Sequence, residues 1–381
     1  MKTLIVGGGP VGLAAALAVK ATGITDDIIV LEAAPRSTES FSDRNIALSS
    51  ASWRFLSSLG VHVADDARAP IREVEVTQRG AFGLLRLSAR DIGTSELGAA
   101  TPYPALKSAL DETTRRAGIT VLYAAKVASV EHVARSAAAR LATGEQMLAD
   151  CVVLADGAGS DLVPEFKRIE RDSGQIAVIT RVSASKPRHG VAVERFTAGG
   201  ALALIPRADQ QWTVIWARPK AEAERLLNID AASVAEAINS AAGSSMGTLT
   251  ITARLTSYPL LWRFVEPRAS GAIVALGNAA QGLHPVAAQG LNLGLRDARD
   301  LARALAHGGT GESRLPIATV LNRYARDRAV DRVARIGFSG VLAYGFDRGG
   351  WLADVPRGLS LTALQLFSPL KQEITRRLAL N

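Results

Sequence analysis

The 381-residue sequence contains one cysteine and only five histidines. Cys151 has no partner for an intramolecular disulfide, and the histidines are too scattered to have the spacing of metal ligands. They are His62, His132, His189, His284 and His307. These shortages exclude a disulfide framework, predict no metal site and fit a reducing compartment.

Long uninterrupted apolar runs are also lacking. The uncharged stretch at residues 3–19 is broken by glycines and by Pro10. A strand, a glycine turn and a helix explain these breaks better than a signal sequence does, and no other stretch is long and apolar enough to span a bilayer. With no leader ahead of the first strand, we expect a cytoplasmic protein.

Aromatic residues make up 5% of the chain, and no aromatic-basic motif of an RNA-binding module accompanies the net charge of +8. We therefore expect no nucleic-acid partner. A basic balance also suits an anionic membrane surface or an acidic ligand, and composition does not choose between these. Apolar residues are plentiful at 48%. That supply is enough for sizeable cores, and the length predicts two domains, with interleaving in sequence allowed.

The clearest motif is GGGPVG near the start of the chain. Residues 2–6 are expected to form a short buried strand, and Gly7, Gly9 and Gly12 then give the spacing GxGxxG at the entry to an alanine-rich helix. The first glycine allows a tight turn, the second lets a pyrophosphate approach the backbone, and the third lets helix and strand pack closely. Glu32 ends the next apolar strand, where a carboxylate can accept hydrogen bonds from a ribose. The joint pattern predicts nucleotide binding.

The middle of the chain carries two weaker signals. By position alone, Arg44 within DRNIAL is an ordinary surface arginine. Asp156 and Gly157, after the apolar run CVVL, are explained by a strand-to-loop turn. Between about 171 and 271 the pattern changes to strands, with clear alternation in GTLTITARL and further candidates in VAVERFT, ALALIP and QWTVIWARP. This region predicts a mainly antiparallel sheet.

A second glycine-rich turn occurs late, in GNAAQGLHPVAAQGLNLG at residues 277–294. The apolar run GAIVAL precedes it, and a helix with an apolar stripe follows it. The preceding strand is suited to the same parallel sheet as the first strand. In that case the late turn returns to the ligand bound at GGGPVG and presents backbone N–H groups to it.

Together these segments resemble the FAD-dependent aromatic hydroxylases, the single-component flavoprotein monooxygenases. The resemblance covers nearly the whole chain and keeps the order of the motifs: GxGxxG with Glu32, DRNIAL, ADGAGS and the late turn. GNAAQ followed by LHP, with ERFT at 194–197 and ALALIP, is most similar to the ubiquinone-biosynthesis hydroxylases. The implied fold class is α/β, with a Rossmann-like FAD-binding domain interleaved with a mainly antiparallel sheet domain and followed by a C-terminal helical segment.

The resemblance also implies domain boundaries and site residues. The expected FAD-binding domain comprises 1–70, 101–170 and 272–325, the substrate-binding sheet domain 71–100 and 171–271, and the C-terminal helical segment 326–381. The residues expected to bind FAD are Gly7, Gly9, Gly12, Glu32, Arg44, Asp156, Gly157, Asn278, Gly290, Leu291 and Asn292. Asn278 stands where relatives commonly have Asp, and its amide oxygen still accepts a ribityl hydrogen bond. Ala288 and Pro104 depart further from the pattern.

The implied reaction uses NAD(P)H as a transient co-substrate to reduce FAD, and O2 then forms a hydroperoxide that oxygenates the ring of a polyprenylated phenol. No catalytic residue is assigned, because the flavin carries the chemistry. Pro285 and His284 are the candidates for positioning the substrate, and His284 is equally a structural loop residue. The alternatives are an FAD-dependent oxidoreductase acting on another aromatic substrate and a non-catalytic FAD-binding scaffold of a quinone-biosynthesis complex.

The C-terminal residues 331–381 combine basic residues with apolar ones at helical spacing, interrupted by Pro369. Two interpretations stay open. The stripe either packs on the protein's own core or lies in the interface of an anionic membrane, which would make the protein peripheral at the inner face of the cytoplasmic membrane.

Overall fold

The computed structural model describes residues 1–25, 27–36, 43–80, 82–157, 161–282, 289–308, 315–329 and 351–380. Its first sheet has six strands in the order β19-β20-β12-β1-β2-β8, and all neighbours are parallel except β19 and β20. The strands are β1 (Thr3–Val6), β2 (Ile28–Leu31), β8 (Thr120–Leu122), β12 (Cys151–Leu154), β19 (Ala269–Ser270) and β20 (Ile273–Ala275). The strand expected within GAIVAL therefore lies beside β12 in the same sheet as β1.

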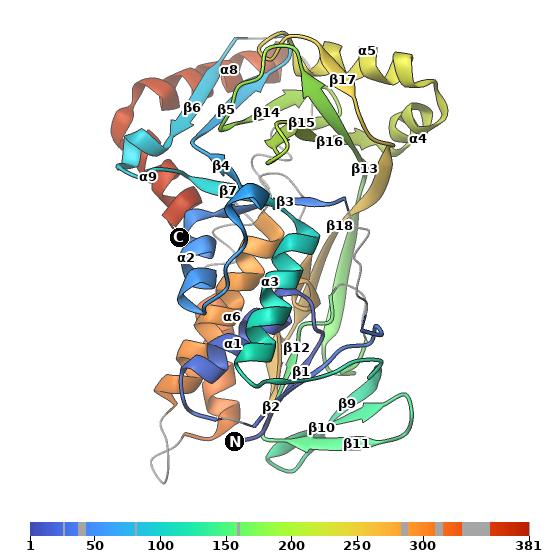
Figure 1. Ribbon diagram of the computed structural model, residues 1–381, viewed down its shortest axis with the longest axis vertical. Helices are drawn as coiled ribbons and strands as arrows, with labels where there is room; N and C mark the ends of the chain where they lie inside the picture. Colours follow the sequence, from blue (N-terminus) through green and yellow to red (C-terminus); the bar gives the residue numbers. More distant parts are fainter. Residues whose placement is uncertain are drawn as a thin grey trace.

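Helices cover one face of this sheet, while a three-stranded meander covers the other (Figure 1). The helices are α1 (Pro10–Ala21), α2 (Ser50–Ser58), α3 (Tyr103–Arg116) and α6 (Gln289–His307), and the meander consists of β9 (Val127–Val133), β10 (Ser136–Leu141) and β11 (Gln146–Ala149). Because both faces are covered, the parallel strands consist of unbroken apolar runs such as TLIV and CVVL.

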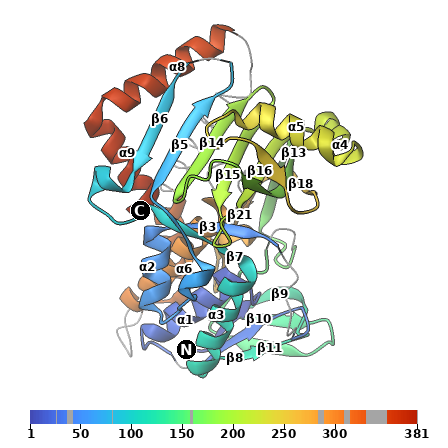
Figure 2. The same ribbon diagram turned by 45° about the horizontal axis from the view of Figure 1, so that its top comes forward.

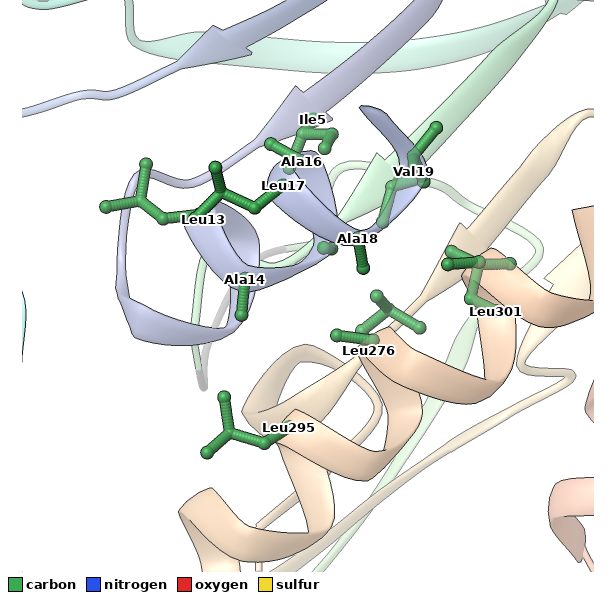
Figure 3. Packing of buried hydrophobic residues seen from close by; sticks show 14 of the residues in the cluster. Ile5, Leu13, Ala14, Ala16, Leu17, Ala18, Val19, Leu276, Leu295 and Leu301 are labelled. Atoms are coloured by element: carbon green, nitrogen blue, oxygen red, sulfur yellow. The ribbon is translucent and has the colours of Figure 1, made fainter. Parts of the chain in front are cut away.

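The alanines of α1 allow α6 to pack closely against it. Figure 3 shows Ala14 and Ala18 of α1 on the side of Leu276 and Leu295, and both leucines are fully or almost fully buried. Each such leucine contributes about 1.5–3 kcal/mol through removal of its surface from water. This contact holds the helix after the first glycine turn against the helix after the late glycine turn.

The second large sheet has nine strands, in the order β21-β18-β13-β16-β15-β14-β5-β6 with β17 beside β13 (Figure 2). They are β5 (Glu73–Gln78), β6 (Leu84–Ser88), β13 (Lys167–Ala184), β14 (Val191–Thr197), β15 (Gly200–Pro206), β16 (Trp212–Pro219), β17 (Leu249–Ile251), β18 (Thr256–Glu266) and β21 (Gln281–Gly282). Only β14 and β5 pair in parallel. One face packs against α4 (Lys220–Asn228) and α5 (Ala231–Ala242).

One strand is shorter than the alternation of GTLTITARL indicates. β17 stops at Ile251, and residues 252–255 follow it outside any strand, although exposed and partly buried side chains still alternate. β17 and β18 pair with the same edge of β13. Because β18 occupies that edge from residue 256 onward, β17 cannot extend further along it.

A small sheet in the order β3-β7-β4 lies between the two large ones (Figure 1). It consists of β3 (Asn45–Ser49), β4 (Ala69–Ile71) and β7 (Gly98–Pro102), and its apolar residues pack against one face of the nine-stranded sheet. The short 3-10 turns are η1 (Asp65–Ala67), η2 (Ala89–Ile92) and η3 (Gly277–Ala279). The predicted fold class, a parallel nucleotide-binding sheet combined with a mainly antiparallel one, is confirmed.

The C-terminal helices are α8 (Trp351–Leu366) and α9 (Ser368–Leu380), so the helical stripe is interrupted near Pro369 as expected. They pack along β6 and η2, where Leu361 and Ala379 are buried and Leu364, Ile374 and Leu378 are partly buried. This part of the stripe forms core. Leu359, Leu366, Phe367 and Leu370 remain exposed. No helix in the described part of the chain has both the length and the apolar composition to cross a membrane.

Candidate functional site

The turn between β1 and α1 has the geometry that the GxGxxG spacing predicts. Gly7 has a φ of +107°, and a Cβ there would lie 2.5 Å from the Ala155 carbonyl oxygen. A Cβ on Gly12 would collide with the Gly7 carbonyl oxygen. Both positions therefore require glycine for steric reasons.

Gly9 differs from its neighbours because it faces open space. No atom lies within 4 Å of the position that its Cβ would take. Gly9 is also the N-cap of α1, and no side chain caps that helix. The N–H groups and the positive dipole end of α1 therefore point toward a place that a phosphate can reach.

Glu32 follows β2 and reaches back to the same turn. Its Oε2 accepts a hydrogen bond of 2.7 Å from the Gly8 N–H, and its Oε1 accepts one of 2.8 Å from the Ala34 N–H. Each carboxylate oxygen has a second lone pair, so both remain able to accept from a ligand hydroxyl. Glu32 thus combines two tasks, fixing the glycine turn and offering acceptors beside it.

Arg44 contacts the first residue of α3, with its guanidinium carbon 4.4 Å from the centre of the Tyr103 ring. Burial raises the pKa of Tyr103, and two opposing charges, that of Arg44 (lowering) and that of Glu32 (raising), act on the same hydroxyl. Arg44 is exposed, as its position alone indicates, and its guanidinium lies over the Tyr103 ring.

The residue before Arg44 connects this segment to the nine-stranded sheet. The Asp43 carboxylate accepts hydrogen bonds from Arg181 at 2.8 Å and from Arg207 at 3.1 Å. The Asn45 side chain donates to the Pro206 carbonyl oxygen at 3.0 Å. DRNIAL is therefore held to the nine-stranded sheet through Asp43 and Asn45, while its strand β3 pairs with β7 of the small sheet.

Asp156 and Gly157 follow β12, which is the neighbour of β1. A Cβ on Gly7 would lie 2.7 Å from the Asp156 Cα, so the two segments are in direct contact. Gly157 has a φ of +93° with open space around its Cβ position. The turn chemistry that explains Asp156 and Gly157 locally thus also places them against the first glycine turn.

The late turn reaches the same place from β20. Gly277 has a φ of +55°, and its Cβ position lies 3.1 Å from Val11, near the start of α1. Gly294 of α6 also packs against Val11 and Gly277. The Cβ position of Gly290 lies 3.9 Å from the Asn278 Oδ1, so these two predicted residues are neighbours.

Leu291 and Asn292 have structural contacts. Leu291 is partly buried and packs on the helical core, while the Asn292 side chain connects α6 to β3 and α2. Its Oδ1 accepts from the Ser49 N–H at 2.8 Å and from the Ser52 hydroxyl at 2.7 Å, and its Nδ2 donates to the Ala47 carbonyl oxygen at 3.1 Å. These bonds fix the start of α6 beside the DRNIAL strand.

The sequence interpretation missed the buried charge cluster behind the late turn. Asp297 is fully buried and accepts hydrogen bonds from Arg328 at 2.8 Å, from the Gly277 N–H at 3.1 Å, from Gln281 at 3.2 Å and from Arg268 at 3.4 Å. The sequence contains one signal for this cluster, a charged residue on the apolar stripe of α6. Asp297 lies three residues after Gly294 and four before Leu301, on the same side of the helix.

The positioning candidates His284 and Pro285 lie outside the described residues, as does Ala288. All eleven residues predicted to bind the cofactor are described. Gly7, Gly9, Gly12, Glu32, Asp156, Asn278 and Gly290 belong to four segments that meet at the start of α1: the first glycine turn, the end of β2, the turn after β12 and the late turn with the start of α6. The meeting point has open space at Gly9, an uncapped helix N-terminus, and carboxylate and amide acceptors, and these groups suit a dinucleotide such as FAD.

Residues 1–335 match the family described as FAD binding domain, and the chain belongs to this family. The predicted family and its FAD cofactor are thereby confirmed. The chain is 27% identical over 377 residues to 3-demethoxyubiquinol 3-hydroxylase of Escherichia coli, with 97% of this chain and 96% of that protein covered. It is also 27% identical over 388 residues to ubiquinone hydroxylase UbiL of Rhodospirillum rubrum, with 98% and 88% covered.

Among solved structures, the fold is similar to that of PqsL from Pseudomonas aeruginosa, which is described as a probable FAD-dependent monooxygenase. The TM-score is 0.78 at 19% identity, and 95% of this chain and 99% of that chain are covered. At this identity the likeness shows a shared fold.

Proposed function

We propose that this protein is an FAD-dependent NAD(P)H:O2 monooxygenase that hydroxylates the aromatic ring of a polyprenylated phenol in ubiquinone biosynthesis, in the manner of a 2-polyprenyl-6-methoxyphenol hydroxylase. The observation that carries the proposal is the convergence of the first glycine turn, the Asp156 turn and the late turn at the start of α1. The likeness to two ubiquinone hydroxylases over nearly the whole chain supports the substrate class.

In this proposal the FAD pyrophosphate lies over Gly9 at the N-terminus of α1. Glu32 accepts hydrogen bonds from the adenosine ribose, and Arg44 approaches the cofactor from the DRNIAL side. Asp156, Gly157 and Asn278 line the ribityl part. Gly290 at the start of α6 offers backbone N–H groups to the flavin ring, while Leu291 and Asn292 hold that helix in position.

When bound, FAD would carry electrons from NAD(P)H to O2, and one atom of that O2 would enter the ring. The tasks of the protein are binding, orientation and exclusion of water. The small β3-β7-β4 sheet provides an apolar layer between the six-stranded sheet and the nine-stranded one. We propose that the FAD-binding and substrate-binding domains meet across this layer, with the boundaries that the sequence predicts.

The test is turnover of the FAD-loaded protein with 18O2, NAD(P)H and a methoxyphenol that carries a prenyl chain. We expect faster NAD(P)H oxidation and one labelled oxygen atom in the product. If all reducing equivalents appear as hydrogen peroxide and the product is unlabelled, the protein is an oxidase toward this substrate class. A yellow protein that is inert toward every phenol would support the scaffold alternative.

A polyprenyl substrate resides in a bilayer, and we propose a peripheral membrane contact through the turn between α8 and α9. Leu366 and Phe367 are 77% and 61% exposed there, next to Leu370. The basic residues nearby contribute less than their number suggests, because Lys371 pairs with Asp91 at 3.1 Å and Arg377 pairs with Glu373 at 2.7 Å. Apolar burial must therefore supply most of the attachment.

Vesicle flotation tests this contact. The double substitution Leu366→Ser with Phe367→Ser should weaken binding to anionic vesicles, whereas Leu148→Ser, at a residue that is 55% exposed on β11, should not. Point substitutions are preferable to truncation after Gly358, because truncation would also uncover the buried stripe beneath α8 and α9. Equal flotation of all variants would exclude the turn.

A further inference from the structure

Strand β14 carries a carboxylate at an unusual place. In the segment VAVERFT, Val193 faces the core under α5, together with Leu204 and Val214, with which it is aligned across the sheet. Side chains alternate along a strand, so Glu194 projects from the opposite face. On that face it is aligned with Val76 of β5 and with Ala203 of β15.

The face that carries Glu194 is directed toward the small β3-β7-β4 sheet. Ala203 is aligned with Ile215, and Ile215 and Ala192 pack against the apolar cluster that includes Ala100 of β7. Ala47 of β3 packs on the same cluster and accepts the hydrogen bond from Asn292 at the start of α6. Glu194 therefore lies on the side of the nine-stranded sheet that looks toward the proposed flavin end of the cofactor.

Three strands that face Glu194 and one strand beside β14 carry no charge. The strands β3, β4 and β7 contain no ionisable side chain, and neither does β15. On its own strand, Arg195 faces the other way and donates to Thr77. Among the described residues, the Glu194 carboxylate has no hydrogen bond and no ion pair.

Burial raises the pKa of Glu194 from 4.5 to about 7, and no neighbouring charge contributes. The residue as a whole is partly buried. An uncompensated carboxylate on an apolar sheet face costs stability, and groups of this kind cluster at functional sites.

We propose that Glu194 accepts the phenolic hydrogen of the aromatic substrate and takes its proton as the ring is attacked. This inference rests on the proposed function, and it names the residue that orients and activates the ring. Pro285, which the sequence suggests as a residue that positions the substrate, would then be secondary to a charged acceptor on β14.

The proton transfer requires only the phenol and the Glu194 carboxylate. The O–H bond of the phenol breaks, its electron pair stays on the phenol oxygen, and the proton binds an oxygen of the Glu194 carboxylate. The phenolate then supplies electron density to the ring carbon that gains the oxygen atom. The hydrogen displaced from that carbon leaves as a proton, and Glu194 returns its own proton to the phenol oxygen.

The acidity of the two groups suits this exchange. A phenol has a pKa of about 10, and a proton acceptor is most effective when its own pKa approaches the operating pH. The buried position of Glu194 brings its pKa closer to that of the phenol than an exposed carboxylate would be, while leaving it ionised above neutral pH.

The first measurement is equilibrium binding of 2-methoxy-6-prenylphenol and its O-methyl ether to the oxidised, FAD-loaded protein at pH 8. The wild type should bind the phenol more tightly than its O-methyl ether. Glu194→Gln should lose roughly 10-fold or more of this preference, because a hydrogen bond to a charged acceptor is lost. Glu145→Gln, on the exposed turn after β10, is the matched control and should behave as the wild type.

The second measurement is hydroxylation per NAD(P)H consumed, as a function of pH. Glu194→Gln should lower the hydroxylation rate by roughly 100-fold or more, the usual range for loss of a general base, and should abolish the acidic limb of the profile. Glu194→Asp should restore part of the rate. A Glu194→Gln protein that retains both the phenol preference and the hydroxylation rate would overturn the assignment.

The measurements distinguish failure of the proposed monooxygenase function from failure of the role proposed for Glu194. If the wild type prefers the phenol through Glu194 but incorporates no labelled oxygen, the binding role is supported and the monooxygenase function is wrong. If the wild type hydroxylates the ring and Glu194→Gln does so equally well, the function stands and the role of Glu194 is wrong. Misfolding is not expected in Glu194→Gln, because the substitution removes an uncompensated buried charge.

Discussion

The substitution Asp297→Asn tests how much the late turn depends on the charge cluster behind it. Asp297 is fully buried between Arg268 and Arg328, whose side chains are 2% and 5% exposed. The Nε and Nη1 atoms of Arg268 have no other hydrogen-bond partner in the described part of the chain. Loss of the negative charge removes the carboxylate that these two buried guanidinium groups share, although Arg328 keeps its contact with Asp300 at 3.3 Å.

The expected cost follows from that geometry. Removing one partner of a buried ion pair typically destabilises a protein by about 3–5 kcal/mol, because the remaining charge stays desolvated. Asp297 also accepts the N–H of Gly277 and the amide of Gln281, and an asparagine retains only one uncharged acceptor oxygen, so the contacts that hold the turn near Asn278 are weakened as well. We therefore expect weaker FAD binding together with the lower stability.

Asp300→Asn is the matched control on the same helix. The Asp300 side chain is 25% exposed and contacts Arg299 and Arg328, so its loss should cost about 1 kcal/mol or less. The assay is denaturant unfolding at one fixed concentration of FAD, combined with fluorescence titration of FAD into the apoprotein. Equal unfolding midpoints and equal FAD affinities for Asp297→Asn and Asp300→Asn would refute the reasoning.

Three further outcomes can be measured. Glu32→Ala should weaken FAD binding by roughly 1.5–3 kcal/mol, the worth of hydrogen bonds to a charged group, and an unchanged titration curve would contradict the ribose assignment. Gly9→Val should abolish FAD binding while leaving the apoprotein folded by circular dichroism, because its side chain would occupy open space outside the fold. Glu194→Gln should be more stable than the wild type above pH 7, by about 3 kcal/mol at most. A folded-state pKa raised from 4.5 to about 7 means that the wild type loses stability as pH rises through this window, so the advantage should disappear below about pH 4.5 in pH-dependent unfolding curves.

The sequence was sufficient for features that are encoded locally. The first glycine turn depends on residues within one βα unit, so its spacing alone predicts Gly7, Gly9 and Gly12. The alternation in β14 and β16 similarly predicts an antiparallel sheet. The resemblance added the order of the motifs, which composition does not contain.

Other features depend on partners that are distant in sequence. Asn292 bonds to Ser49 across 243 positions, and Asp297 bonds to Arg328 across 31. Helix propensity treats both residues as ordinary polar positions on a helix, because it does not take into account the residues that pack against that helix. The unusual character of Glu194 likewise arises from three facing strands that lack charge, and these strands are far apart along the chain.

The order of strands in the six-stranded sheet has a consequence for how the protein is made. β1 emerges first from the ribosome, yet its neighbour β12 is synthesised about 145 residues later and β20 later still. The late turn is complete only when α6 has been translated. Through most of its synthesis, the nascent chain therefore lacks part of the cofactor site. The strand TLIV has no β12 to pair with until that later segment is made. Capture of FAD must follow translation of at least three quarters of the chain, and a supply of FAD then favours the completed fold by mass action.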